Sequence, residues 1–426
     1  LPKVELVTRM IAPFPDSAAA DSRPLREVVG EFFALGGALA DVTTGDFEFE
    51  ARPQQQQMAD AVAAALADER HLIVEAGTGV GKSLAYLVPL LLHAQQQGIR
   101  VLVSTHTIAL QEQLLGKDLP MLHERLGFEF RAVLVKGRMN YLCRRRLARA
   151  RSHQRELFGD GVAEELERIR TWADKTEDGS LQEWRHEPSA EAWGAVCAEH
   201  GNCLGAKCPE RKRCFLLRAR AKMQDAHLLV ANHHLLFSDL ALRQDGAAFL
   251  PDVGAVVLDE AHMVEDTASE HLGLRLSTYG FEHWLRRLFV PESGKGLLGY
   301  LRAGAAARVA TELWPAVADL FHEVPRLVGL GPHDGQKVVA QPLQLVTNVP
   351  ELMHQLSTEL EILGEDLVGQ DEDSRAELRS LRGQGIALSK MLEAFLDQSM
   401  PDHVYWLERE GRRRQPVLYS APIEVA

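Results

Sequence analysis

One short stretch, AGTGVGKS from Ala76 to Ser83, most constrains how this chain can fold. It follows the apolar run HLIVE and opens KSLAYLVPLLLHAQQQ, a stretch that has the pattern of a helix. A glycine-rich loop between a strand and a helix turns its backbone N–H groups inward around phosphates, and the helix N-terminus adds positive potential. The sequence therefore predicts a phosphate-binding loop within an α/β fold.

The loop and a second motif assign roles to individual residues. We expect Lys82 to bridge the β- and γ-phosphates of ATP and Ser83 to bind Mg²⁺. A second carboxylate is needed at the end of another strand, and AVVLDEAH supplies Asp259 for the Mg²⁺ shell and Glu260 to polarise the attacking water. The remaining phosphate contacts are expected from Gly77, Thr78, Gly79 and Gly81.

Short runs rich in Val, Leu and Ile recur along the chain, and helical stretches separate several of them. Runs that are apolar on both faces and spaced by helices predict a parallel sheet covered on both sides, so the expected fold class is α/β. Two segments interrupt this pattern, one rich in cysteine and arginine and one helical. The runs are HLIVEA, RVLVST, RAVLVK, HLLVAN and AVVLDE.

The charge distribution limits where nucleic acid can bind. The net charge of −13 excludes a protein that coats nucleic acid with its whole surface, so any contact must come from local basic patches. Residues 131–155 contain no Asp or Glu, and KCPERKRCFLLRARAK is similarly basic. Such runs are usually solvated faces, but two of them flanking the cysteines favour a track for backbone phosphates. Tyr141 and Phe215 either stack on bases or pack locally.

Neither a membrane span nor a secretory signal is expected. The longest apolar run, around Leu84 to Leu92, is interrupted by Pro89 and is too short to cross a bilayer. The N-terminal LPKVELVTRM has no initiator Met and no signal-peptide core. We therefore expect a cytoplasmic protein, with this chain as a fragment of it.

Four of the five cysteines lie between Cys197 and Cys214, with gaps of five, four and five residues. An odd number of cysteines without a secretory signal disfavours disulfides. The gaps are wider than the two to four residues usual at zinc sites, whereas iron–sulfur clusters tolerate more varied spacing. Spacing alone favours a cluster over zinc by a narrow margin, and both remain open at this point.

DEAH together with AGTGVGKS resembles the helicases of superfamily two. RPQQQQM is similar to their adenine-reading motif, with Gln55 preferred over Gln54. VSTHTIALQEQL resembles the motif that contacts the DNA backbone, in which Thr105 is the expected contact, and His262 is expected to couple the nucleotide site to the motor. VANHHLLFSDL and LVKGRMNYLC narrow the resemblance to the XPD-like, DinG-type DNA helicases.

This resemblance implies a RecA-like motor domain with two insertions, and a 4Fe–4S cluster held by four cysteines. The implied ligands are Cys143, Cys203, Cys208 and Cys214, which leaves Cys197 as a spare buried residue. The implied domains are an extension (1–45), the motor domain (46–140, 226–264 and 404–426), the cluster domain (141–225) and a helical arch (265–403). The chain is expected to stop before the second motor domain and so to hydrolyse ATP poorly by itself.

The resemblance implies an ATP-dependent DNA helicase of 5′ to 3′ polarity, acting as a monomer on DNA with a single-stranded region, in repair or replication. Two other functions stay open. One is a nuclease with an ATP-binding regulatory module, although residues 1–45 lack the clustered acidic residues that such a nuclease needs. The other is a nucleotide-gated DNA-binding module without helicase activity.

Overall fold

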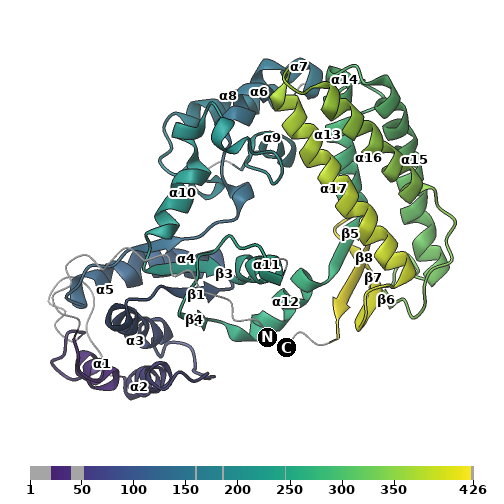
Figure 1. Cartoon of the computed structure of the whole chain (residues 1–426). Helices are drawn as coiled ribbons and strands as arrows, with labels where there is room; N and C mark the ends of the chain where they lie inside the picture. The colour runs from purple at the N-terminus through teal and green to yellow at the C-terminus, as the bar shows by residue number, and fades with distance from the viewer. Residues whose placement is uncertain (1–20, 40–51, 159–160, 185–186, 245, 424–426) are drawn as a thin grey trace. The chain divides into compact units, whose positions relative to one another are not determined.

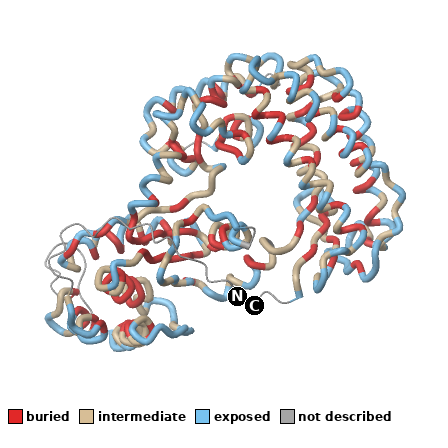
Figure 2. The backbone as a smooth tube through the Cα atoms, in the orientation of Figure 1, coloured by how far each residue is buried: buried red, intermediate tan, exposed pale blue. Residues whose placement is uncertain are grey.

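The structure is a computed structural model, and its backbone path and residue burial are shown in Figures 1 and 2. The residues that it describes are 21–39, 52–158, 161–184, 187–244 and 246–423. The chain divides into two compact units, each assembled from two separate stretches. The first unit takes Leu1–Lys136 and Ala219–Thr267, and the second takes Gly137–Arg218 and Ala268–Ala426.

A parallel sheet of four strands lies at the centre of the first unit, in the order β2-β3-β1-β4. Four of the five predicted apolar runs form these strands, which confirms the parallel sheet and the α/β class for this unit. The strands are β1 (Val101–Thr105), β2 (Ala132–Leu134), β3 (Leu228–Asn232) and β4 (Ala255–Leu258).

Helices cover both faces of this sheet (Figure 1). Val101 and Val103 pack into a core with α1, α2 and α3, whereas Leu102 between them packs on the other face with Leu236 of α11 and with Leu250. This alternation is what a strand requires when both of its faces are buried. The helical elements of the unit are α1 (Leu25–Phe33), α2 (Pro53–Ala67), α3 (Lys82–Gln97), α4 (Ile108–Gln113), the π-helical turn η1 (Leu114–Asp118), α5 (Leu119–Arg125), α11 (His233–Gln244) and the short turn η6 (Ala261–Met263).

The predicted strand immediately before the phosphate loop is wrong. Residues 71–77 form no strand, and the side chains of Leu72, Ile73 and Val74 are 43%, 96% and 40% exposed. An apolar run becomes a strand only when a neighbouring backbone pairs with it, and within the described residues β4 pairs only with β1. The expectation of an N-terminal extension falls largely on residues 1–20 and 40–45, which lie outside the described residues.

The second unit combines helices with an antiparallel sheet in the order β5-β8-β7-β6. The two strands near the end of the chain, within the segment 404–426 that the resemblance assigns to the motor domain, pair with β5 and β6 and not with the parallel sheet. Neither β5 nor β6 was predicted, because both are short strands within a segment of helical pattern. The strands are β5 (Leu274–Ser277), β6 (Gln336–Val338), β7 (His403–Glu410) and β8 (Gln415–Pro422).

Five helices pack against this sheet around one continuous apolar core. The helical character expected of this segment is confirmed, since Leu356 and Leu360 are buried on α16 and Leu378 and Leu392 on α17. Asp371 caps α17 by accepting a hydrogen bond from the Ser374 amide. The helices are α13 (Thr278–Leu288), α14 (Leu297–Tyr300), α15 (Gly304–Val328), α16 (Val349–Asp366) and α17 (Glu372–Asp397).

The cysteine-rich stretch of the second unit is made of short helices and turns. Its elements are η2 (Arg138–Asn140), α6 (Arg144–Ser152), α7 (Gln154–Leu157), α8 (Val162–Ala173), η3 (Leu181–Glu183), α9 (Ala190–Val196), η4 (Gly205–Lys207) and η5 (Arg211–Arg213). The chain passes between the units at residues 136–137 and within α10 (Phe215–Gln224) and α12 (Val264–Leu272). In the described part of the chain, no helix is both long and apolar enough to span a membrane.

Candidate nucleotide site and cysteine cluster

The phosphate loop is held in place by residues of α2. Gln55 is buried and donates a hydrogen bond of 2.9 Å from its side-chain amide to the Gly81 carbonyl. Gln54 is exposed, so Gln55 is the glutamine that faces the loop. Arg52 donates a hydrogen bond of 2.6 Å to the Gly79 carbonyl. These two hydrogen bonds anchor the loop backbone at the carbonyls of Gly79 and Gly81. Gly77 and Thr78 lie in the exposed part of the loop.

The loop conformation requires glycine at Gly79 and Gly81. Both have positive φ angles, +81° and +86°, in the left-handed region that residues with a Cβ rarely adopt. A Cβ added at Gly81 would also lie 2.1 Å from the side-chain nitrogen of Gln55. The helix α3 begins at Lys82, directly after this turn, so its N-terminus faces the loop.

Asp259 follows β4 at the carboxyl edge of the sheet and is 9% exposed. The Tyr86 hydroxyl donates a hydrogen bond of 3.0 Å to one carboxylate oxygen of Asp259, and the Glu260 amide donates to the other at 3.0 Å. Burial and the Asp259 charge raise the pKa of Tyr86, while a hydrogen bond from Ser83 partly offsets this rise. The two residues predicted to bind Mg²⁺, Ser83 and Asp259, therefore meet at the same tyrosine hydroxyl.

Glu260 lies within reach of the loop lysine. The distance from Lys82 Nζ to Glu260 Oε1 is 3.6 Å, and each side chain is about a third exposed. Glu260 has a φ of +53°, an unfavourable conformation for a residue with a Cβ and one that is concentrated at functional sites. His262 is 70% exposed and its Nδ1 lies 3.5 Å from Glu260 Oε2. The structure thus brings Lys82, Glu260 and His262 together.

The structure does not present the predicted DNA contact to solvent. Thr105, the last residue of β1, is fully buried, and its hydroxyl donates a hydrogen bond of 3.4 Å to the Thr107 carbonyl. Thr107 caps α4 by accepting from the Leu110 amide. The exposed positions at this edge begin with Thr107 and Ile108, because β1 is covered on both faces through Thr105.

The four predicted cluster ligands lie at the start of α6 and around the turns η4 and η5. Burial raises the pKa of Cys143 and of Cys208, and the charge of Cys208 adds to the rise at Cys143. Cys203 and Cys214 in turn raise the pKa of Cys208, so Cys208 interacts electrostatically with each of the other three cysteines. Among the described residues, no three Cys, His, Asp or Glu side chains are arranged to hold a metal ion.

Backbone amides point at three of these sulfur atoms. The Gly205 amide donates to Cys203 Sγ at 3.4 Å. Hydrogen bonds from the Arg146 and Glu210 amides lower the pKa of Cys143 and Cys208, partly offsetting burial. Amide-to-sulfur hydrogen bonds are typical of cysteine thiolates in iron–sulfur sites, so the chemistry of these donors suits such a cluster, although their side chains are not gathered around one point in this structure.

Cys197 lies in different surroundings. It is 1% exposed, and burial raises its pKa while Arg146 and Arg287 oppose the rise. The Arg146 guanidinium donates to the Cys197 carbonyl at 2.5 Å. The electrostatic neighbours of Cys197 are therefore arginines and a glutamate, not the other cysteines.

Four of the eight arginines of the first basic run form ion pairs within the second unit, which argues against a phosphate track at these four positions. Arg145 and Arg146 are both 3% exposed, and their partners, Asp373 and Glu377, come from α17. Arg144 pairs with Asp174, and Arg151 pairs with Glu167. The sequence could not show this, because the acidic partners lie up to 231 residues away along the chain.

The aromatic residues beside the cysteines are also buried. Tyr141 is 5% exposed and Phe215 is 1% exposed, so neither offers a ring face to a nucleobase. The guanidinium groups of Arg144 and Arg218 lie 4.8 Å and 4.9 Å from the centre of the Phe215 ring. Local packing, the alternative interpretation, is the one observed.

Three buried charges and the partly buried Arg287 join the cysteine-rich stretch to the helical part of the second unit. Glu377 of α17 contacts Arg146 at 2.8 Å and Arg287 at 3.4 Å, and Glu199 contacts Arg287 at 2.7 Å and Arg146 at 3.5 Å. Burial favours the neutral acids, but the two arginines outweigh it and lower the pKa of Glu199 to about 2 and that of Glu377 still further. We call these four residues the buried charge network.

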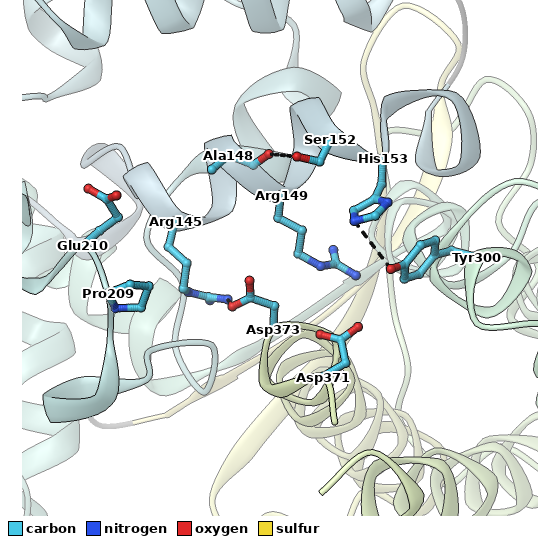
Figure 3. Close-up of a pocket in the computed structure, with 10 residues that line it drawn as sticks. All are labelled: Arg145, Ala148, Arg149, Ser152, His153, Pro209, Glu210, Tyr300, Asp371 and Asp373. Atoms are coloured by element: carbon cyan, nitrogen blue, oxygen red, sulfur yellow. Dashed lines mark hydrogen bonds and ion pairs between the residues drawn. The ribbon is translucent and has the colours of Figure 1, made fainter. Parts of the chain in front are cut away.

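A pocket of about 250 Å³ lies at the N-terminus of α17 (Figure 3). Arg145 reaches Asp373 across it, and Arg149 lies between α6 and the Tyr300 ring. Asp371 also lines this pocket while it caps α17, so the pocket has charges of both signs.

The comparison with known proteins agrees with this geometry. Residues 52–152, which include the phosphate loop and the strand β1, match the DEAD/DEAH box helicase family. Residues 52–152 are thus the part of this chain that is similar to a DEAD/DEAH box helicase domain, and we call them the helicase domain.

Two relatives of this chain are named as helicases. The chain is 37% identical over 252 residues to the ATP-dependent DNA helicase YoaA of Escherichia coli, covering 58% of this chain and 38% of that protein. It is 38% identical over 245 residues to the ATP-dependent helicase DinG of Mycobacterium tuberculosis, covering 53% and 36%. The alignments thus span little more than a third of each relative. A solved structure of truncated XPD aligns with a TM-score of 0.42 at 15% identity, covering 87% of each chain.

Three polar residues of the first unit escaped the sequence-based prediction. Tyr86 lies one helical turn after Lys82 on α3, so its spacing was the available signal. Asp118 is buried, which raises its pKa, and it also interacts with Ser83. His233 directly follows β3 at the carboxyl edge of the sheet, where ligands bind in open α/β folds.

Replacing Gly81 with alanine in the helicase domain should weaken Mg²⁺–ATP binding about tenfold, since the added Cβ displaces the Gln55 amide and breaks its hydrogen bond to the Gly81 carbonyl. Gly98→Ala at the other end of α3 is the matched control, because Gly98 also has a positive φ, +64°, but a Cβ there meets no atom within 4 Å. Isothermal titration and thermal melting measure both variants. Equal losses of affinity would show that the positive φ, not the contact with Gln55, matters.

Proposed function

We propose that this chain binds Mg²⁺–ATP and DNA as part of an ATP-dependent DNA helicase. The observation that carries the proposal is the convergence of α3 and β4, in which Ser83 and Asp259 meet at the Tyr86 hydroxyl while Lys82 and Glu260 lie 3.6 Å apart. The helicase domain and its relatives, named as DNA helicases, support the same function.

The proposed chemistry of ATP hydrolysis depends on position and charge. Lys82 and the amides of the loop neutralise the β- and γ-phosphates, and Ser83 and Asp259 hold Mg²⁺. Tyr86 and the Glu260 amide fix the orientation of the Asp259 carboxylate by hydrogen bonds to both of its oxygens. Glu260 polarises the attacking water, and Gln55 supports the loop and the adenine side of the site.

For DNA, we propose a single-stranded region as the ligand. The second basic run supports this, because Lys207, Arg211 and Lys212 are exposed around the turns η4 and η5. Exposed lysines and arginines bind the phosphate backbone without regard to sequence. A 5′ to 3′ polarity, a role in repair or replication, a monomeric state and a cytoplasmic location complete the proposal and rest on the resemblance described above.

We propose Cys143, Cys203, Cys208 and Cys214 as the ligands of a 4Fe–4S cluster. Their mutual electrostatic influence and the backbone amides at three of their sulfur atoms support this ligand set. When bound, the cluster would cross-link the start of α6 to the turns η4 and η5. Cys197 is left outside the ligand set.

Replacing Lys82 with alanine tests the nucleotide site. Removing one partner of a hydrogen bond to a charged phosphate costs about 1.5–3 kcal/mol, so Mg²⁺–ATP should bind roughly 10- to 150-fold more weakly. Glu260→Gln should keep the affinity, because its role lies in hydrolysis. Isothermal titration measures both, with Lys222→Ala on the exposed face of α10 as the control. Unchanged affinity in Lys82→Ala would exclude this loop as the phosphate site.

Two other functions give different results with DNA. A nuclease would shorten an end-labelled oligonucleotide in the presence of Mg²⁺, whereas a helicase would leave the label in place. A nucleotide-gated DNA-binding module would bind both ligands but would not separate strands. A strand-displacement assay on a partly single-stranded duplex, with the full-length protein, distinguishes this module from a helicase.

A further inference from the structure

His233 joins the ends of three neighbouring strands in the first unit. It is the first residue of α11, directly after β3, and its side chain is fully buried. Its Nδ1 lies 2.7 Å from the Ser104 hydroxyl near the end of β1, and its Nε2 lies 2.9 Å from the Asp259 carbonyl just after β4. One imidazole ring therefore spans the carboxyl edge of the sheet.

The chemistry of these two partners defines the direction of both hydrogen bonds. A carbonyl oxygen can only accept, so Nε2 must carry the proton and donate to Asp259. Nδ1 of the neutral ring is then an acceptor and receives the hydroxyl proton of Ser104. Burial lowers the pKa of His233, which favours this neutral form. The ring thus transmits a directed hydrogen-bond chain from Ser104 to the backbone of Asp259.

The series of hydrogen bonds from Ser104 through His233 to Asp259 lies where the regular pairing of β1 and β4 ends. The last ladder bond runs from the Asp259 amide to the Ser104 carbonyl at 2.8 Å, and beyond it the two strands diverge. Past Ser104, β1 leads through Thr105 to the exposed start of α4. Past Asp259, the chain enters the left-handed turn at Glu260. His233 is therefore the link between the segment after β1 and the carboxylate predicted to hold Mg²⁺.

A second histidine, His106, makes the carboxyl edge of the sheet sensitive to changes in the segment after β1. The ring of His106 lies 6.3 Å from the ring of His233, between their centres. The Nδ1 atom of His106 is buried and has no hydrogen-bond partner. A buried polar atom without a hydrogen-bond partner is destabilising, so a change in this segment that gives His106 Nδ1 a partner is favourable and acts next to His233.

We propose that His233 is a positioning residue that couples DNA binding at the segment after β1 to Mg²⁺–nucleotide binding at Asp259. The coupling rests on the proposed function, and it assigns a role to the VANHHLLFSDL motif. Movement of Ser104 changes the hydrogen bond to Nδ1, and the rigid ring transmits the change to the Asp259 backbone. By reciprocity, nucleotide binding at Asp259 changes DNA affinity by the same factor.

Variants that each remove one hydrogen bond of the ring test the coupling. Ser104→Ala removes the bond to Nδ1 and keeps the bond to Asp259. His233→Gln places an amide N–H near the position of Nε2 and also loses the bond to Ser104. His233→Asn keeps an acceptor near the position of Nδ1 but no longer reaches the Asp259 carbonyl. His123→Leu is the matched control, because His123 lies on α5 in the same unit and contacts Glu129 at the surface.

The measurement is the dissociation constant of a fluorescent, non-hydrolysable ATP analogue with Mg²⁺, with and without a single-stranded oligothymidine. In the unmodified chain and in His123→Leu, the oligonucleotide should change this constant by about fivefold or more. In Ser104→Ala and His233→Gln, the factor by which the oligonucleotide changes the dissociation constant should fall close to one. The affinity for the ATP analogue without DNA should stay within about threefold of that of the unmodified chain. In His233→Asn the affinity without DNA should itself fall. Melting curves of each variant establish that it is folded.

The results separate this inference from the proposed function. If the unmodified chain binds neither ligand, the proposed function fails. If it binds both but shows no coupling, or if Ser104→Ala and His233→Gln keep the full factor, the role of His233 is overturned while the proposed function stands. Loss of the factor in His123→Leu would likewise overturn the assignment to His233.

Discussion

Replacing Glu377 with alanine should lower the free energy of unfolding of the second unit by about 3–5 kcal/mol. Glu377 is 5% exposed and contacts the guanidinium groups of both Arg146 and Arg287. Its removal leaves two positive charges buried with Glu199 as their only remaining partner in the buried charge network. The cost comes from this uncompensated burial more than from the loss of attraction between the pair.

Tryptophan fluorescence measures this unit selectively. All six tryptophans of the chain, at positions 172, 184, 193, 284, 314 and 406, belong to the second unit. Urea unfolding of Glu377→Ala can be compared with Glu361→Ala, in which the lost ion pair with Arg382 has a similar length, 2.8 Å, but is largely exposed. The control should lose at most about 1 kcal/mol. Equal losses in the two variants would contradict the importance of burial.

A double variant separates the charge from the packing. Arg146→Met combined with Glu377→Leu removes one opposite-charge pair and fills its space with apolar groups. Such replacements are often neutral, so the double variant should be more stable than the sum of the two single losses predicts, by about 1–3 kcal/mol. Additive losses would indicate that the two residues act independently, despite their contact at 2.8 Å.

Replacing Cys143 with serine should remove the iron–sulfur cluster almost completely, whereas Cys197→Ser should keep it. Cys143 interacts electrostatically with Cys208, which in turn interacts with Cys203 and Cys214. Cys197 instead neighbours Arg146 and Arg287. Cys143 is partly buried and precedes a helix, whereas Cys197 is buried and follows one. The two positions are similar enough that each substitution is a control for the general effect of replacing a cysteine with serine.

Anaerobic purification, iron and sulfide analysis and the visible absorption spectrum measure the cluster. The unmodified chain and Cys197→Ser should be coloured and contain about four iron atoms, and Cys143→Ser should be nearly colourless. A colourless unmodified protein with stoichiometric zinc would contradict the cluster. Loss of iron in Cys197→Ser, with retention in Cys143→Ser, would reverse the assignment of the ligands.

The predictions from sequence were most accurate where a local sequence pattern also met a physical requirement of the fold. Four apolar runs became parallel strands because each is short, apolar on successive residues and preceded by a turn or helix. The phosphate loop formed because Gly79 and Gly81 allow the left-handed backbone that the turn requires. Asp259 and Glu260 reached the loop because the carboxyl ends of parallel strands meet at one edge.

The wrong predictions share one cause. In each case the structure of the segment depends on residues that are distant in the sequence. Leu72, Ile73 and Val74 have the composition of a strand, but no neighbouring strand pairs with them. Arg145 and Arg146 have the composition of a DNA-binding surface, but α17 supplies the acids that neutralise them. No local pattern reveals which distant carboxylate an arginine will meet.

The division of the chain into interleaved stretches has a consequence for its biosynthesis. The strands β1 and β2 leave the ribosome early, yet neither pairs with the other, and their shared neighbour β3 begins only at Leu228. The whole cysteine-rich stretch is therefore translated before the central sheet can begin to assemble. Such sequence-distant contacts slow folding and prolong the exposure of apolar strands. Nascent chains stalled before Leu228 should thus depend on chaperones far more than chains released after β4.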